Sequence, residues 1–108
     1  MMNPDEITED ITVEGLQDYV RRMVITRGFD NESVSNKLVL LMEEMGELAK
    51  AVRKEAGMKF SETTRRTELE EELADVQIVL LDIAGKLGVN MRAAVAAKEM
   101  KNSQRTWK

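Results

Sequence analysis

The sequence contains neither cysteine nor histidine. Without cysteine, disulfide frameworks, thiolate zinc sites and thiol nucleophiles are all excluded. Without histidine, the chain has no imidazole metal ligand and cannot build a Ser-His-Asp triad. Any metal would have to be held by oxygen ligands, which are the ligands that Mg²⁺ and Mn²⁺ prefer.

The chain also has little aromatic content (4%), a net charge of -4 and no apolar run of membrane-spanning length. Its core must therefore be built from aliphatic side chains and methionines. A chain of this charge lacks the basic footprint of a nucleic-acid binder, so we expect no nucleic-acid polymer and no membrane as partners. The acidic start, with Asp5, Glu6, Glu9 and Asp10, is unlike a signal peptide and favours a cytoplasmic location.

The length of 108 residues suits one domain. We expect a flexible acidic N-terminal tail over residues 1–11 and a single domain over residues 12–108. Apolar residues recur at helical spacing, and glycines separate the segments, which predicts helices over about 13–27, 34–56, 64–87 and from 91 to 102 or beyond. Thr12, Ser33 and Asn90 are the predicted N-caps. The predicted fold is all-α and resembles a four-helix bundle.

The middle of the third predicted helix, residues 76–81, is apolar on almost every side. Such a helix is normally buried all round, and four short helices cannot enclose one of their own members. We therefore expect oligomerisation to complete the bundle, with Ile78 and Leu81 facing a neighbouring chain. The alternative is a few tolerated surface aliphatic residues.

Acidic residues cluster on two of the predicted helices: Glu43, Glu44 and Glu47 on the second, Glu72 and Asp75 on the third. Residues three apart share a helix face. Antiparallel packing along the apolar stripes (Leu41, Met45, Leu48 and Val52 on the second helix; Leu69, Val76, Leu80 and Ile83 on the third) would bring four of these carboxylates together. Glu44, Glu72 and Asp75 have no Lys or Arg three or four positions away, although solvated helix faces usually provide one. The pattern thus favours a divalent metal site over a merely solvated acidic face.

The C-terminal segment is basic, and Lys98, Asn102 and Arg105 follow one another at i, i+4 and i+7. This spacing predicts one face of the fourth helix. An ammonium, an amide and a guanidinium in a row suit the oxygens of a polyphosphate. The alternative is that bases gather here to complement the helix dipole.

Together these motifs resemble the signature of the MazG-type all-α nucleoside triphosphate pyrophosphohydrolases. The resemblance rests on E-E-x-x-E (Glu43, Glu44, Glu47), 24 intervening residues, E-x-x-D (Glu72, Asp75) and the later K-x-x-x-N-x-x-R (Lys98, Asn102, Arg105). It implies Mg²⁺-dependent, or Mn²⁺-dependent, hydrolysis of a nucleoside triphosphate to a monophosphate and pyrophosphate. It also implies a homo-oligomer, either a dimer or a tetramer, with active sites near subunit contacts.

Carried over by residue, the resemblance makes Glu44, Glu47, Glu72 and Asp75 the metal ligands. Lys98, Asn102 and Arg105 would hold the phosphates, and Glu43 would lie beside the metal or act as the base, a role for which Glu47 is the alternative. Two other functions remain open: phosphoribosyl-ATP pyrophosphohydrolase, and a non-catalytic helical module that binds a nucleotide or another protein.

Recognition of the base is the least determined part of this interpretation. Gln17, Tyr19 and Phe29 are candidates for the nucleoside pocket, whereas Trp107 is expected to anchor the C-terminal tail. Asp82 lies on a face similar to that of Asp75, and we expect Lys86, four residues later, to pair with it.

Overall fold

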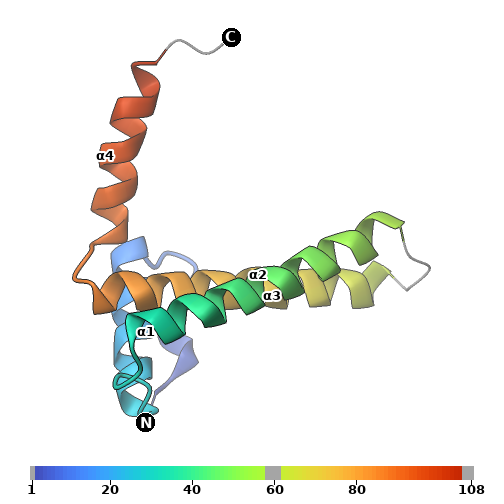
Figure 1. The fold of residues 1–108 in the computed structure, drawn as a ribbon, viewed down its shortest axis with the longest axis horizontal. Helices are drawn as coiled ribbons and strands as arrows, with labels where there is room; N and C mark the ends of the chain where they lie inside the picture. The colour runs from blue at the N-terminus through green and yellow to red at the C-terminus, as the bar shows by residue number, and fades with distance from the viewer. Residues whose placement is uncertain (1, 58–61, 106–108) are drawn as a thin grey trace.

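The computed structural model describes residues 2–57 and 62–105. This part of the chain forms the one-turn helix η1 (Pro4–Glu6) and four longer helices, α1 (Val13–Thr26), α2 (Val34–Gly57), α3 (Glu62–Lys86) and α4 (Met91–Ser103), and it contains no strand (Figure 1). The predicted all-α class is confirmed. α3 begins about two residues earlier than the glycine and apolar pattern predicted.

The helix ends follow the capping residues of the sequence. The side-chain oxygens of Thr12, Ser33 and Asn90 each accept a hydrogen bond from a backbone N–H in the first turn, at 2.9–3.1 Å. These bonds satisfy donors that have no partner inside the helix. α1 and α3 are each followed by a glycine with positive φ, Gly28 (77°) and Gly88 (71°), a conformation that other residues rarely adopt. The three predicted N-caps are therefore confirmed.

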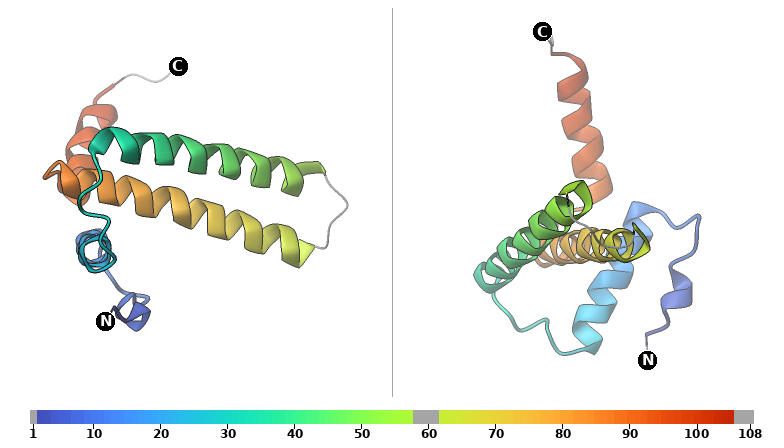
Figure 2. Two further views of the ribbon diagram at one scale, coloured as in Figure 1. Left: turned by 60° about the horizontal axis from the view of Figure 1, so that its bottom comes forward. Right: turned by 90° about the vertical axis from the view of Figure 1, so that its right-hand side faces the viewer.

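α2 and α3 form a long antiparallel hairpin, as the views in Figures 1 and 2 agree. An ion pair joins the two helices toward each end. Lys37 contacts Asp82 with an Nζ–Oδ2 distance of 2.6 Å, and Lys54 contacts Glu68 with an Nζ–Oε2 distance of 3.4 Å. A third ion pair, between Arg66 and Glu55 at 2.6 Å, also crosses the hairpin. Together these contacts mark its register, and the register decides which carboxylates face one another in its middle.

The small core lies where α1 packs across α3. Val20, Val24 and Leu81 are buried there, and Leu16, Met23 and Met91 pack around them. Leu81 is only 3% exposed, so the prediction that it faces a neighbouring chain is wrong. α1 covers this side of α3 and buries Leu81 within the single chain, whereas Ile78 is 37% exposed.

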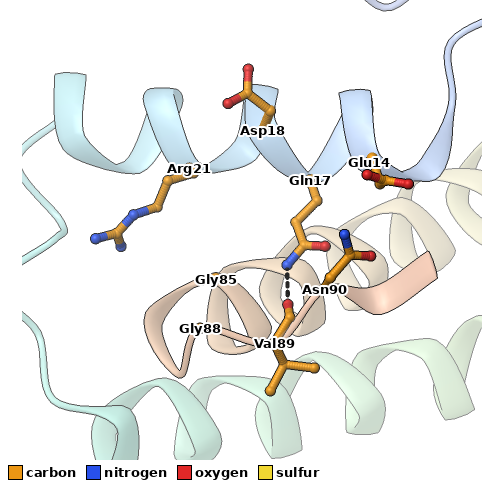
Figure 3. Close-up of a pocket in the computed structure, with 8 residues that line it drawn as sticks. All are labelled: Glu14, Gln17, Asp18, Arg21, Gly85, Gly88, Val89 and Asn90. Carbon is orange, nitrogen blue, oxygen red and sulfur yellow. Dashed lines mark hydrogen bonds between the residues drawn. The ribbon is translucent and has the colours of Figure 1, made fainter. Parts of the chain in front are cut away.

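α4 is joined to α1 at its beginning. Gln17 of α1 donates to the carbonyl of Val89 at 2.7 Å (Figure 3). It also accepts from the backbone N–H of Met91 at 3.0 Å. Glu14 and Arg92 form an ion pair beside these bonds. From this junction α4 points away from the α2–α3 hairpin (Figures 1 and 2), and none of its residues, all of them described, is buried.

The single chain leaves much apolar surface uncovered. Met45 and Val52 of the predicted α2 stripe are 53% and 50% exposed, and Leu80 of the α3 stripe is 40% exposed. These residues were predicted to lie in the core, and the structure corrects this for the single chain. These residues stay exposed because the α2–α3 contact does not bury them and α4, which points away from the hairpin, does not cover them (Figure 1).

The N-terminal segment contacts α1 through an ion pair and through Pro4 and Ile7, which line a pocket with Leu16 and Tyr19. Glu6 of η1 binds Arg22 of α1 with an oxygen–nitrogen distance of 3.0 Å, and Arg22 also binds Asp18 at 3.0 Å.

Candidate active site

Three carboxylates meet in the middle of the α2–α3 hairpin. Glu44 comes from α2, and Glu72 and Asp75 come from successive turns of α3. Each offers an oxygen, and these oxygens all lie within 4.8 Å of one another. We call these three residues the carboxylate group. Glu44 lies far from Glu72 and Asp75 in the sequence, and it meets them because the two helices are antiparallel in this register.

The electrostatics of the carboxylate group are unfavourable as long as all three side chains are ionised. Burial raises the pKa of Glu44, and the negative charges of Asp75, Glu72 and Glu47 raise it further. Burial likewise raises the pKa of Glu72, with added contributions from the charges of Asp75 and Glu47. Each pKa shift means that the folded chain disfavours the ionised form, which is the state a metal ligand needs.

This donor set fits a divalent cation of the kind that prefers oxygen ligands. Oε2 of Glu72 is buried and has no hydrogen-bond partner in the part of the chain that the structure describes. A cation would satisfy this oxygen and offset the repulsion among the three charges.

Glu47 and Glu43 lie outside the group of three oxygens. Glu47 is exposed and lies 3.8 Å from Lys50, yet its charge is near enough to raise the pKa of both Glu44 and Glu72. Glu43 is exposed on α2, next to Glu44 in the chain. The structure therefore brings three of the four predicted ligands together and leaves Glu47 at their edge.

The predicted phosphate-binding row lies elsewhere in the single chain. Lys98 and Arg105 are exposed and Asn102 is partly buried. α4 ends at Ser103, so Arg105 follows the helix rather than lying on it. Because α4 points away from the hairpin, the row does not meet the carboxylate group of its own chain (Figure 1).

A pocket of about 220 Å³ lies beside the carboxylate group, between the end of α1, the start of α2 and α3. Leu40 and Val79 line it, and each is four residues, or about one helical turn, from a member of the group: Leu40 from Glu44 and Val79 from Asp75. The other lining residues are Met23, Val24, Arg27, Phe29, Glu32, Lys37, Ile78 and Asp82. We call this cavity the seam pocket.

The sequence-based pairing of Asp82 with Lys86 is wrong. Asp82 is 8% exposed and binds Lys37, while Lys86 donates to the backbone carbonyl of Asp30. Lys37 is 2% exposed and also donates to the carbonyl of Phe29 at 3.1 Å. No direct signal in the sequence indicates this pair, because its members are 45 residues apart and only the hairpin register joins them.

The three candidates for base recognition have different surroundings. Tyr19 is 3% exposed and belongs to the core, and Gln17 is bonded to the turn between α3 and α4. Phe29 is 51% exposed and lines the seam pocket. Trp107 lies outside the described residues. A separate pocket at the α1–α4 junction (Figure 3) includes Gly85, about 15 Å along α3 from Asp75, so it lies apart from the carboxylate group.

Comparison with known protein families gives one match. The family described as the MazG nucleotide pyrophosphohydrolase domain matches residues 32–107, which include the carboxylate group and α4. A search of curated proteins finds no significant match. None of the helices in the described part of the chain is long and apolar enough to cross a membrane.

Proposed function

The chain belongs to the MazG nucleotide pyrophosphohydrolase family, and from this premise we propose that it hydrolyses nucleoside triphosphates to nucleoside monophosphates and pyrophosphate. In the reaction, water is added across the P–O–P bridge between the α and β phosphates. The bridge breaks, and the nucleoside monophosphate and pyrophosphate separate. Such an activity would remove unwanted nucleotides from the cellular pool. The observation that supports it best is the carboxylate group, with its close oxygens and the unpartnered Oε2 of Glu72.

Glu44, Glu72 and Asp75 would hold Mg²⁺, or Mn²⁺, with Glu47 at the edge of the site. The ion would neutralise charge on the phosphate chain, which is the main requirement of phosphoryl transfer. Glu43 is our candidate for the base that accepts a proton from the attacking water, and Glu47 is the alternative. A carboxylate is a reasonable base in a chain without histidine.

We further propose that the active form is a homo-oligomer, a dimer or a tetramer. The apolar residues exposed on α2 and α3 would be covered by a second copy. Because α4 points away from its own hairpin (Figure 1), we propose that Lys98, Asn102 and Arg105 serve the site of that second copy. In this arrangement the phosphate row and the carboxylate group come from different chains.

The proposal is tested by measuring pyrophosphate release from a panel of ribo- and deoxyribonucleoside triphosphates, with Mg²⁺ and with EDTA. We expect metal-dependent release of pyrophosphate and monophosphate. The Asp75→Asn chain is the control, and it should be inactive but folded. If no nucleoside triphosphate of the panel releases pyrophosphate but phosphoribosyl-ATP, assayed in the same way, does, then phosphoribosyl-ATP is the substrate. Nucleotide binding without turnover, or no response at all, would instead support a non-catalytic module.

A further inference from the structure

The seam pocket contains an ion pair that the proposed hydrolysis does not use. Lys37 and Asp82 are nearly buried, and their side chains are 2.6 Å apart. Oδ2 of Asp82 accepts from Lys37, but Oδ1 is buried and has no hydrogen-bond partner in the described residues. An ionised carboxylate is purely an acceptor, so this oxygen can be satisfied only by a donor.

The position of the pair relative to the carboxylate group is set by the hairpin register. Lys37 precedes Glu44 by seven residues, and Asp82 follows Asp75 by seven residues. The pair is therefore two turns, or about 10 Å, along the same seam from the proposed metal site. This is the scale of a nucleoside monophosphate, measured from its phosphate to the far edge of its base.

The seam pocket is also of suitable size and character. Its volume of about 220 Å³ is below the roughly 300–1,000 Å³ of pockets that enclose a whole drug-sized ligand, so it suits a base rather than a complete nucleotide. Apolar Met23, Leu40 and Val79 line it. Phe29 also lines it, and its aromatic ring can stack on a base. Among these residues, Asp82 provides the unsatisfied acceptor.

From this geometry we propose that Asp82 selects nucleotides whose base carries an exocyclic amino group, with Lys37 holding the carboxylate in place. An amino group such as N4 of cytosine donates to a carboxylate, and this is a common pairing in base recognition. A carbonyl oxygen at the same position, as in uracil, is itself an acceptor, so it would be repelled by the carboxylate oxygen. The inference rests on the proposed function and names the substrate class of the same site.

The test compares CTP with UTP, which differ at position 4 of the ring and in the protonation of N3. We expect the wild-type chain to favour CTP in kcat/KM by about 5- to 150-fold, the range of one well-placed base contact. In the Asp82→Asn chain, the ratio should fall toward one or invert, because the amide also donates. The Lys37→Met, Asp82→Leu double variant removes the whole pair without leaving a buried charge, and it should also bring the CTP/UTP ratio toward one.

Three results would decide against the inference. A wild-type ratio near one, a preference for UTP, or an unchanged ratio in a folded double variant would each overturn it while leaving the proposed hydrolysis in place. If the wild-type chain hydrolyses neither nucleotide, the proposed function fails by itself. Calorimetric binding of CMP and UMP to the same three chains then tests base selection directly, and equal affinities would overturn it.

Discussion

At the residue scale, Glu44 shows how a site can oppose the fold that contains it. It lies in the middle of α2, where burial disfavours its charge and Asp75, Glu72 and Glu47 all add negative charge. Its ionised form is therefore less favourable in the folded chain than in the unfolded chain. The residue is thus placed for a cation rather than for the stability of the metal-free protein.

This placement predicts the behaviour of Glu44→Gln. Because the pKa of Glu44 is raised on folding, its contribution to stability is highest below its ordinary value of 4.5 and is lost as the pH rises through the folded-state pKa. Without metal, the Gln chain should therefore unfold at higher urea than the wild type at pH 7–8, by about 0.5–1 kcal/mol from relieved like-charge pairs. Near pH 4 the two chains should be equal.

Addition of Mg²⁺ should reverse the order at pH 7–8, because only the wild-type site gains a full set of ligands. The Gln chain should also lose at least about 100-fold in kcat, as is typical when a key electrostatic group is removed. Glu70→Gln, on an exposed position of α3, is the matched control and should change neither property. A Gln chain less stable than the wild type at pH 7–8 without metal would contradict this account.

At the element scale, the α2–α3 hairpin is the scaffold of the site, and its register depends on contacts outside the site. Helical spacing and the unpaired acids of the sequence led to Glu44, Glu72 and Asp75, and the structure brings their oxygens together. Spacing along one helix did not lead to the Lys37–Asp82 pair, because Lys86 offered a local partner for Asp82. The actual partner is chosen by packing between helices, which single-helix periodicity does not describe.

The importance of this pair predicts a large effect of Lys37→Met. The substitution leaves the Asp82 carboxylate buried without a counter-charge, and the free energy of unfolding should fall by about 3–5 kcal/mol, as measured by urea denaturation. Adding Asp82→Leu should recover most of the loss. If the single substitution costs less than about 1 kcal/mol, the ion pair does not hold the hairpin register.

At the scale of the whole molecule, the prediction of four helices is confirmed, but the role assigned to Leu81 is not. Residues 76–81 are apolar on almost every side of α3 for two reasons, and the sequence alone does not distinguish between them. α1 covers one side of α3 within the chain, and other residues such as Ile78 and Leu80 stay exposed. The packing of α1 across α3 decides which of these residues are buried and which stay exposed.

If the phosphate row serves the site of a second copy, two defective chains should repair each other. We expect Glu44→Gln and Arg105→Ala to be nearly inactive alone. Mixed, unfolded and refolded together, they should regain up to about a quarter of wild-type activity, because half of the chains form mixed dimers with one intact site each. Activity that stays at the level of the separate chains would place the row and the carboxylates in one chain.

The register of the hairpin also limits how the gene can change. Glu44 follows Lys37 by seven residues on α2, and Asp82 follows Asp75 by seven residues on α3. Across the seam, Lys37 contacts Asp82 and Glu44 lies close to Asp75. A codon inserted or deleted within one interval would rotate the carboxylates about 100° away from the pocket. A matching change in the other interval would restore the distance along the helices but not the rotation, so single-codon insertions and deletions are expected to be lost from both intervals.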